Sequence, residues 1–228
     1  MSQACGGDYQ ESATLSKLME EVVFTIGHST HSEDHLISLL RKHMVAVVCD
    51  VRSQPYSRMN PQFNRENLKD RLRADGIRYV FLGKELGARS DDATCYVNGK
   101  LQYDRLAHTE LFHRGLQRVK TGMKKFRIVL MCAERDPIEC HRTILVARYL
   151  TKDGVTIRHI HADSSLETHT EALHRLARQL HLPIDEHDFF RSRDDLFAEA
   201  YRLQGDRIAY DAGESRLANG RALKSAAG

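Results

Sequence analysis

The stretch Arg127-Ile-Val-Leu-Met-Cys132-Ala-Glu134-Arg135-Asp136-Pro137-Ile-Glu139-Cys140-His141-Arg142-Thr-Ile-Leu-Val-Ala-Arg-Tyr-Leu150 decides the fold. Residues 128–131 form a continuous apolar run, which is typical of a strand that is buried on both faces. Residues 143–150 are almost wholly apolar and predict a buried helix. The stretch is therefore a strand followed by a helix, as in a parallel α/β sheet.

The residues between this strand and this helix carry a helix-start signal. Asp136 fits the N-cap position, Pro137 the first helical position, and Glu139 the third position, which completes a capping box. This places Cys132 at the carboxyl end of the strand. It places three more residues on the first turn of the helix: Cys140, His141 and Arg142. In an open parallel sheet, ligands bind at this edge.

The same alternation of strand and helix extends outward along the chain. Apolar runs predict further strands at residues 22–26, 45–51, 77–82 and 155–160. Leucines at helical spacing predict helices after Ser32, through Leu68 to Gly76, at about 105–121 and at about 166–180. An Asn98-Gly99 pair within an irregular segment predicts a tight hairpin.

These elements predict an α/β fold with an open, mainly parallel five-stranded sheet and helices on both faces. A small hairpin insert and a C-terminal helical extension complete the prediction. We expect three parts: a mobile arm at residues 1–20, the α/β domain at 21–183, and a C-terminal helix with a flexible tail at 184–228. The expected helix of the last part lies near residues 194–203, and the tail begins after about residue 211.

Composition restricts the class of protein. Of the 228 residues, 41% are hydrophobic and 29% are charged, which is ordinary for a globular protein. No apolar run approaches the roughly 20 residues of a membrane helix, and the polar N-terminus is not typical of a signal peptide. Five scattered cysteines predict reduced thiols and a cytoplasmic location. The net charge of +3 suits an anionic small molecule as well as a nucleic acid.

Polar residues that follow the strands should meet at one edge of the sheet, because all parallel strands end there. We expect this edge to hold a functional pocket. The candidate catalytic residues are Cys140, Cys132, His141, His28 and Glu134. His28 directly follows Gly27 and is a candidate general base, since imidazole titrates near neutral pH.

Three hypotheses remain open for Cys132 and Cys140. They are buried structural thiols, or a nucleophilic or redox pair, or metal ligands together with His141 or His28. The spacing of the two cysteines matches no usual zinc pattern. If a thiol is reactive, we expect Cys140, because the helix start and His141 and Arg142 should lower its pKa. Glu134 should raise the pKa of Cys132.

Three arginines indicate that the ligand is an anion. Arg52, Arg58 and Arg89 offer planar forks that suit phosphate or carboxylate. Tyr56 and Phe63 lie in the same loop as Arg58 and could flank a ring. The remaining candidate substrate-binding residues are Asp50, Ser29 and Arg142. We expect Asp50 to orient Arg52 or a neighbouring donor rather than to react itself.

Four spaced motifs together resemble a known family. They are Phe24-Thr-Ile-Gly-His28-Ser, Asp50-Val-Arg52-Ser, Ser57-Arg58-x-x-Pro61-x-Phe63 and Cys132-Ala-Glu134-x-Asp-Pro137-x-x-Cys140-His141-Arg142. Over about residues 22–161 the chain resembles the family catalogued as domain of unknown function 488. The resemblance implies a bacterial-type cytosolic α/β domain. It implies no particular reaction for this chain.

The leading hypothesis is an enzyme that acts on an anionic, nucleotide-like or nucleic-acid-derived substrate through a Cys/His/Arg site. The alternatives are a non-catalytic module that binds nucleic acid or a nucleotide, and a metal-binding protein that uses Cys132, Cys140 and His141. The sequence identifies no cofactor and no definite metal, and it leaves the oligomeric state open. We expect no membrane partner.

Overall fold

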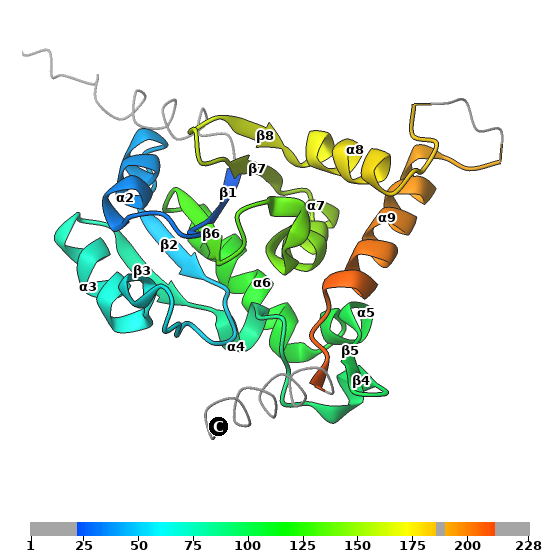
Figure 1. The fold of residues 1–228 in the computed structure, drawn as a ribbon, viewed down its shortest axis with the longest axis horizontal. Coiled ribbons are helices and arrows are strands. Elements are labelled where there is room, and N and C mark those ends of the chain that lie inside the picture. Colours follow the sequence, from blue (N-terminus) through cyan, green and yellow to red (C-terminus); the bar gives the residue numbers. More distant parts are fainter. Residues whose placement is uncertain (1–21, 186–189, 213–228) are drawn as a thin grey trace, which may run out of the picture.

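The structure is a computed structural model that describes residues 22–185 and 190–212. In this part of the chain the main sheet has six strands in the order β3-β2-β6-β1-β7-β8, of which β8 is antiparallel and the others are parallel (Figure 1). The strands are β1 (Val22–Gly27), β2 (Val47–Asp50), β3 (Arg78–Phe81), β6 (Ile128–Cys132), β7 (Thr156–Ile160) and β8 (Leu166–Thr168). A separate hairpin is formed by β4 (Tyr96–Val97) and β5 (Lys100–Leu101).

Helices of several kinds connect these strands. The α-helices are α2 (Glu33–Lys42), α3 (Arg65–Ala74), α4 (Gly83–Leu86), α5 (Tyr103–Ala107), α6 (Glu110–Met123), α7 (Arg148–Lys152), α8 (His169–Gln179) and α9 (Arg193–Ile208). Short 3-10 helices span Pro61–Phe63, Ala93–Cys95 and Pro137–Glu139, and a π-helix spans Arg142–Ala147.

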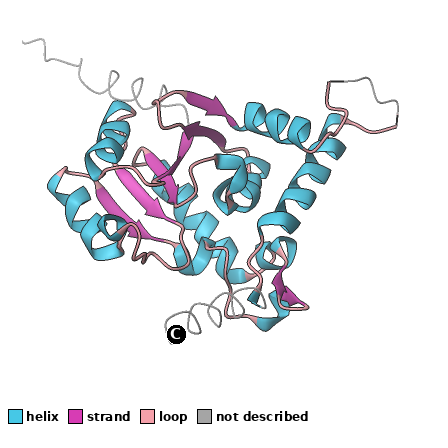
Figure 2. Ribbon diagram, in the orientation of Figure 1, coloured by secondary structure: helices cyan, strands magenta, loops and turns pink. Residues whose placement is uncertain are grey.

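The helices pack on both faces of the sheet. Leucines of α2 and α3, such as Leu36 and Leu68, pack on one face with Phe24 and Val129 of the strands. Residues from α5 to α9 and the π-helix pack on the other face. Figure 2 shows the strands between these two groups of helices. Alternate residues of each central strand therefore contribute to two different cores, which explains why β1, β2 and β6 are mainly apolar.

The structure confirms the predicted α/β fold class and several local features, although the main sheet has six strands rather than the predicted five. Ser32 caps α2, since its side chain accepts a hydrogen bond from the backbone of His35. The predicted hairpin forms at Asn98 and Gly99, whose φ angles of 51° and 83° are the positive values that a tight two-residue turn requires. Gly76, with a φ of 73°, follows the C-cap of α3 as predicted.

Two predicted helices differ from those observed. Leu166, predicted to face inward from a helix, lies instead in the sixth strand, β8, because the capping box of Thr168 and Glu171 starts α8 only at His169. The helix predicted at about 105–121 is divided into α5 and α6. Thr109 separates them, because its side chain caps α6 by accepting from the backbone of Phe112.

The C-terminal helix α9 extends further than predicted and joins the main core. Its capping box of Ser192 and Asp195 sets its start, and Ala200 and Tyr201 belong to the same buried cluster as Ile144 of the π-helix. The predicted mobile arm at residues 1–20 and most of the predicted tail lie outside the described residues, so the division into three parts stays a prediction. Within the described ranges, every helix is too short or too polar to cross a membrane.

Candidate functional site

The candidate site lies at the carboxyl end of β6, which is the strand between β1 and β2. The chain leaves β1 for a helix on one face of the sheet, and it leaves β6 for helices on the other face. Such a change of side is a topological switch point, where open α/β sheets bind ligands. Cys132 ends β6, and its carbonyl accepts a hydrogen bond from the backbone of His28 at 2.9 Å. Cys132 and His28 therefore stand together at the predicted edge.

Gly27 allows the end of β1 to approach the loop that follows β6. A Cβ atom at this position would lie 1.8 Å from the carbonyl oxygen of Glu134, so no larger residue fits without moving that loop. The backbone of Ser29 then donates to the carbonyl of Ala133 at 2.9 Å. The glycine therefore sets the position of Glu134 relative to Cys132. In the sequence, Gly27 is distinguished only as the neighbour of His28, because its contact with Glu134 forms between distant segments.

The helix start predicted at Asp136 is partly wrong. Asp136 does accept from the backbone of Ile138, but the helix that it caps is a single 3-10 turn. Cys140 follows this turn in an extended conformation with φ −135° and ψ 140°, so it is not the fourth residue of a helix. Its carbonyl accepts from Thr143 and Ile144, so Cys140 stands directly before the longer helical run. Asp136 and Pro137 therefore start only the short turn, and the longer helical run begins after Cys140.

His141 is held by one ring nitrogen and faces the two thiols with the other. Its Nε2 lies 3.0 Å from the carbonyl oxygen of Val51, which can only accept, so Nε2 carries a hydrogen. Its Nδ1 lies 3.7 Å from Sγ of Cys132 and 3.8 Å from Sγ of Cys140. The backbone N–H of Arg142 also donates to Sγ of Cys140, at 3.4 Å. The fold thus directs one imidazole nitrogen at two sulfur atoms.

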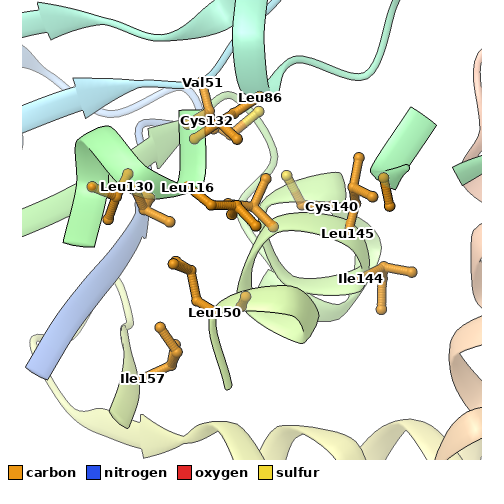
Figure 3. Packing of buried hydrophobic residues seen from close by; sticks show 14 of the residues in the cluster. Val51, Leu86, Leu116, Leu130, Cys132, Cys140, Ile144, Leu145, Leu150 and Ile157 are labelled. Carbon is orange, nitrogen blue, oxygen red and sulfur yellow. The ribbon is translucent and has the colours of Figure 1, made fainter. Parts of the chain in front are cut away.

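Cys132, Glu134, Cys140 and His141 form one cluster, in which one ligand atom from each residue lies within 4.8 Å of the others. Both cysteines are buried in the main core (Figure 3). His141 is also buried, whereas Glu134 is partly exposed to solvent and directs Oε2 inward to 2.8 Å from Sγ of Cys140. The cluster is therefore closed by protein on the side of the thiols and reaches solvent at Glu134.

The two thiols have opposite pKa shifts. Burial, followed by the hydrogen bond and negative charge of Cys140, raises the pKa of Cys132 well above its ordinary value. Burial acts in the same direction on Cys140, but the Cys132 hydrogen bond and the cationic Arg142 and His141 outweigh it and hold the pKa of Cys140 well below its ordinary value. Burial opposes protonation of His141, but Cys140 and Glu134 raise its pKa. The sequence likewise predicted a lower pKa for Cys140 than for Cys132, although the helical turn expected at Cys140 is absent.

Arg142 holds the loop after β6 from inside the protein. Its side chain is buried, and it donates to the carbonyl of Glu134 at 2.7 Å and to the carbonyl of Arg135 at 3.2 Å. It lies at the start of the π-helix, a rare conformation that occurs often at functional sites. In the structure Arg142 therefore acts on the position of Glu134, and its predicted contact with a substrate stays a prediction.

His28, Asp50 and Arg52 form a buried network beside the cluster. Arg52 donates to both carboxylate oxygens of Asp50, at 2.9 and 2.6 Å, and to Nε2 of His28 at 3.0 Å. Since Nε2 of His28 accepts, its Nδ1 donates to the carbonyl of Ser29 at 2.8 Å. Burial, and then Arg52, lower the pKa of His28 to about 4. As predicted, Asp50 orients Arg52; both nitrogens of His28 are engaged within the protein.

Two aromatic residues complete this network. Phe63 is fully buried, and its ring centroid lies 4.4 Å from that of His28. Its carbonyl accepts from Arg52 at 2.9 Å. The hydroxyl of Tyr79 in β3 donates to Asp50 at 2.7 Å, a contact that the sequence does not indicate because Tyr79 lies within a strand. Phe63 therefore packs inside the protein, whereas the other aromatic candidate, Tyr56, is 64% exposed.

The remaining candidates lie at or near the surface. Arg58 is exposed on the same loop as Tyr56. Arg89 is also exposed, and its guanidinium lies 4.2 Å from the ring centroid of Tyr210, at a cavity of about 600 Å³ that Ser53 and Lys84 also line. The structure thus brings together the Cys, Glu and His candidates, with the His28 network beside them, and leaves Arg58 and Arg89 outside that group.

Tyr103 is a further residue near the cluster that sequence reasoning missed. It is buried in α5, and burial, followed by the negative charges of Cys140, Cys132 and Glu134, raises its pKa. Its position depends on how α5 packs against α9 and the π-helix, since the ring also lies against Gly205. No local pattern in the sequence indicates this neighbourhood.

Comparison with known proteins gives a family. A family model described as Domain of unknown function DUF488 matches residues 32–150, more than half of the chain. The matched range contains all four residues of the Cys132 cluster, together with Asp50 and Arg52, but not His28. A search of curated proteins and a search of solved structures found no significant match. The chain therefore belongs to the family Domain of unknown function DUF488.

Proposed function

We propose that this protein is a metal-dependent enzyme of the hydrolytic class that acts on an anionic, nucleotide-like or nucleic-acid-derived substrate. Cys132, Cys140 and His141 hold a zinc-type ion in this proposal, and Glu134 takes the fourth position. Two thiolates and an imidazole are the donors that zinc prefers. Three protein ligands and one exchangeable position are typical of catalytic zinc sites.

The observation that carries the proposal is the position of His141 Nδ1 relative to the two sulfur atoms. With zinc bonds of about 2.3 Å to sulfur and about 2.0 Å to nitrogen, the sulfur–nitrogen edge of a tetrahedron is about 3.5 Å. The separations of 3.7 and 3.8 Å lie within about 0.3 Å of this edge. The hydrogen bond from Nε2 to the carbonyl of Val51 is the outer contact that metal-bound histidines usually make.

Glu134 differs from the other three ligands. It is partly exposed, and its Oε2 lies 2.8 Å from Sγ of Cys140, whereas a tetrahedral sulfur–oxygen edge is about 3.5 Å. The carboxylate must therefore move outward to share an ion, and its exposure leaves it room to do so. A ligand that moves can exchange with water or substrate. If an ion were bound, it would supply charge stabilisation. Glu134 would then serve as the general base that takes a proton from the water attacking phosphorus and returns it to the oxygen that leaves when the P–O bond breaks.

The anionic substrate rests on the exposed side chains near this edge of the sheet. Arg58 and Tyr56 lie exposed on the loop after β2, where a guanidinium and a ring could meet a phosphate and a base. Arg52 is already bonded to Asp50 and His28, so its role in this proposal is to position the loop. In this proposal Arg58 and Tyr56 bind the anionic substrate, and the buried Arg52 does not.

Metal analysis of the full chain, purified under reducing and chelator-free conditions, tests the ion. We expect about one equivalent of zinc or another soft divalent metal in the wild type. Cys132→Ala and Cys140→Ala should lose it. Cys49→Ala, which removes a buried cysteine outside the cluster, is the matched control and should keep it. Metal-free wild-type protein with intact thiols, or equal metal loss in the control, would reject the ion.

The reaction is tested with the metal-loaded protein and a panel of nucleotides and short oligonucleotides. We expect hydrolysis by the wild type and a loss of at least about 100-fold in Glu134→Gln, the range for removing a general base. The variant should still bind metal through its three other ligands. Metal-loaded protein that hydrolyses none of these compounds, or a fully active Glu134→Gln, would contradict the assigned reaction while leaving the metal site in place.

A further inference from the structure

A second cavity lies among α7, α8, α9 and β7, and it has a volume of about 750 Å³. Figure 1 shows α7 within the angle between α8 and α9. The cavity is lined by Val155, Thr156 and Ile157, at the amino-terminal end of β7. It therefore lies toward the opposite edge of the sheet from the Cys132 cluster. Its volume is within the range of sites for small molecules, about 300–1,000 Å³.

The lining of this cavity is cationic. It contains Arg148, Lys152 and Arg158, against a single acidic residue, Asp194. Arg148 is paired with Asp104 at 3.0 Å and lies 4.9 Å from the ring centroid of Tyr201. Several cations gathered around one cavity attract an anion, and the attraction is stronger where water is partly excluded.

The rest of the lining suits a phosphate group with an apolar or aromatic part. Thr156 and Thr170 contribute hydroxyl groups to the lining. The hydroxyls of Thr151 and Thr168, which also line the cavity, donate within the protein, to the Ala147 carbonyl and to the Glu171 carboxylate. The same lining contains the apolar side chains of Val155, Ile157, Leu173 and Phe197. A cavity that offers both polar and apolar groups can bind a small molecule that carries both.

The floor of the cavity is a buried chain of hydrogen bonds. The hydroxyl of Tyr201 lies 2.6 Å from Nε2 of His169, whose Nδ1 lies 3.2 Å from Nε2 of His159. His159 continues the chain to Thr25 of β1 at 2.7 Å. These contacts join α9, α8, β7 and β1 and hold the floor in one arrangement. A cavity with a fixed floor loses less conformational freedom when a ligand binds.

We propose that this cavity binds a phosphorylated small molecule with an aromatic part, through Lys152 and the hydroxyls of Thr156 and Thr170, at a site separate from the Cys132 cluster. The proposal does not depend on the reaction assigned above. ADP is the probe, because it combines a diphosphate with an aromatic ring. Pyrophosphate and adenosine each carry one of these two parts.

Calorimetric titration of the full-length protein tests the proposal. We expect ADP to bind with a Kd below about 1 mM, pyrophosphate to bind more weakly, and adenosine to give no saturation at about 10 mM. Lys152→Glu should raise the Kd for ADP about tenfold or more, and Asp194→Lys should lower it several-fold. Both residues are exposed, so these variants should fold. Lys69→Glu, the same charge change on α3 across the sheet, is the matched control.

Four outcomes would overturn the assignment. They are no saturable binding of ADP, an equal effect of Lys152→Glu and Lys69→Glu, binding of adenosine as tight as that of ADP, and loss of ADP binding in Cys140→Ala. The last outcome would place the ligand at the Cys132 cluster instead. Unchanged binding in Cys140→Ala, together with weaker binding in Lys152→Glu, supports a separate site even if the metal-dependent reaction is not observed.

Discussion

Replacing Gly27 by alanine should destabilise the protein and displace a residue of the candidate site. The added Cβ would lie 1.8 Å from the carbonyl oxygen of Glu134, and an ordinary contact begins at 3.4 Å, so β1 and the loop must separate by about 1.6 Å. Overpacking of this kind costs about 1–3 kcal/mol. The backbone hydrogen bonds of His28 to Cys132 and of Ser29 to Ala133, both 2.9 Å, span the same junction.

Weakening those two hydrogen bonds adds about 1 kcal/mol each, so the free energy of unfolding should fall by about 3–5 kcal/mol. That is a large part of the 5–15 kcal/mol that is typical of a domain. Urea unfolding followed by circular dichroism measures the change. Gly154→Ala is the control, because Gly154 has a φ of 82° and nothing within 4 Å of the added atom, so only backbone strain of about 1–2 kcal/mol acts there.

The reasoning is refuted if Gly27→Ala loses no more stability than Gly154→Ala. It is also refuted if Gly27→Ala binds zinc as tightly as the wild type, because the carbonyl that must move belongs to Glu134, a proposed ligand. A competition titration with a coloured chelator measures that affinity in the same preparations.

Three further predictions concern charge. Asp50→Ala should lower the free energy of unfolding by about 3–5 kcal/mol, because it leaves the buried Arg52 without its carboxylate partner, and a loss below about 1 kcal/mol in urea unfolding would contradict this. Burial lowers the pKa of His169 from 6.5 to about 4. Between these pH values His169 becomes protonated in the unfolded chain but not in the folded protein. The free energy of unfolding therefore falls as the pH drops from 6.5 to 4. His169 alone should lower the free energy of unfolding by about 1.3 kcal/mol between pH 7.5 and 5.5. In His169→Gln the free energy of unfolding should therefore change by about 1.3 kcal/mol less over this range, and an equal change in the two proteins would reject the assignment. Arg58→Ala should change stability by less than about 0.5 kcal/mol, since Arg58 is exposed, but should weaken the binding of nucleotides and oligonucleotides, and unchanged binding in a titration would remove Arg58 from the substrate site.

The sequence alone determined the parallel core and the edge of the sheet at which polar residues gather. The apolar runs of β1, β2 and β6 are signals of burial on both faces, and they lie within single short segments where periodicity can be recognised. The Asn98-Gly99 turn and the Ser32 cap are equally local, because each depends on the conformation of a few adjacent residues. The family motifs place Cys132, Glu134, Cys140 and His141 within one stretch.

Only the tertiary structure decided how those side chains meet. Cys140 is extended rather than helical, and His141 can face both sulfur atoms because its other nitrogen bonds to Val51, which is 90 residues away in the chain. Gly27 matters through its contact with Glu134, across two strands that are distant in sequence. The cavity at Lys152 likewise depends on how α9 packs. These features arise from packing between distant segments, and local propensity contains no information about such contacts.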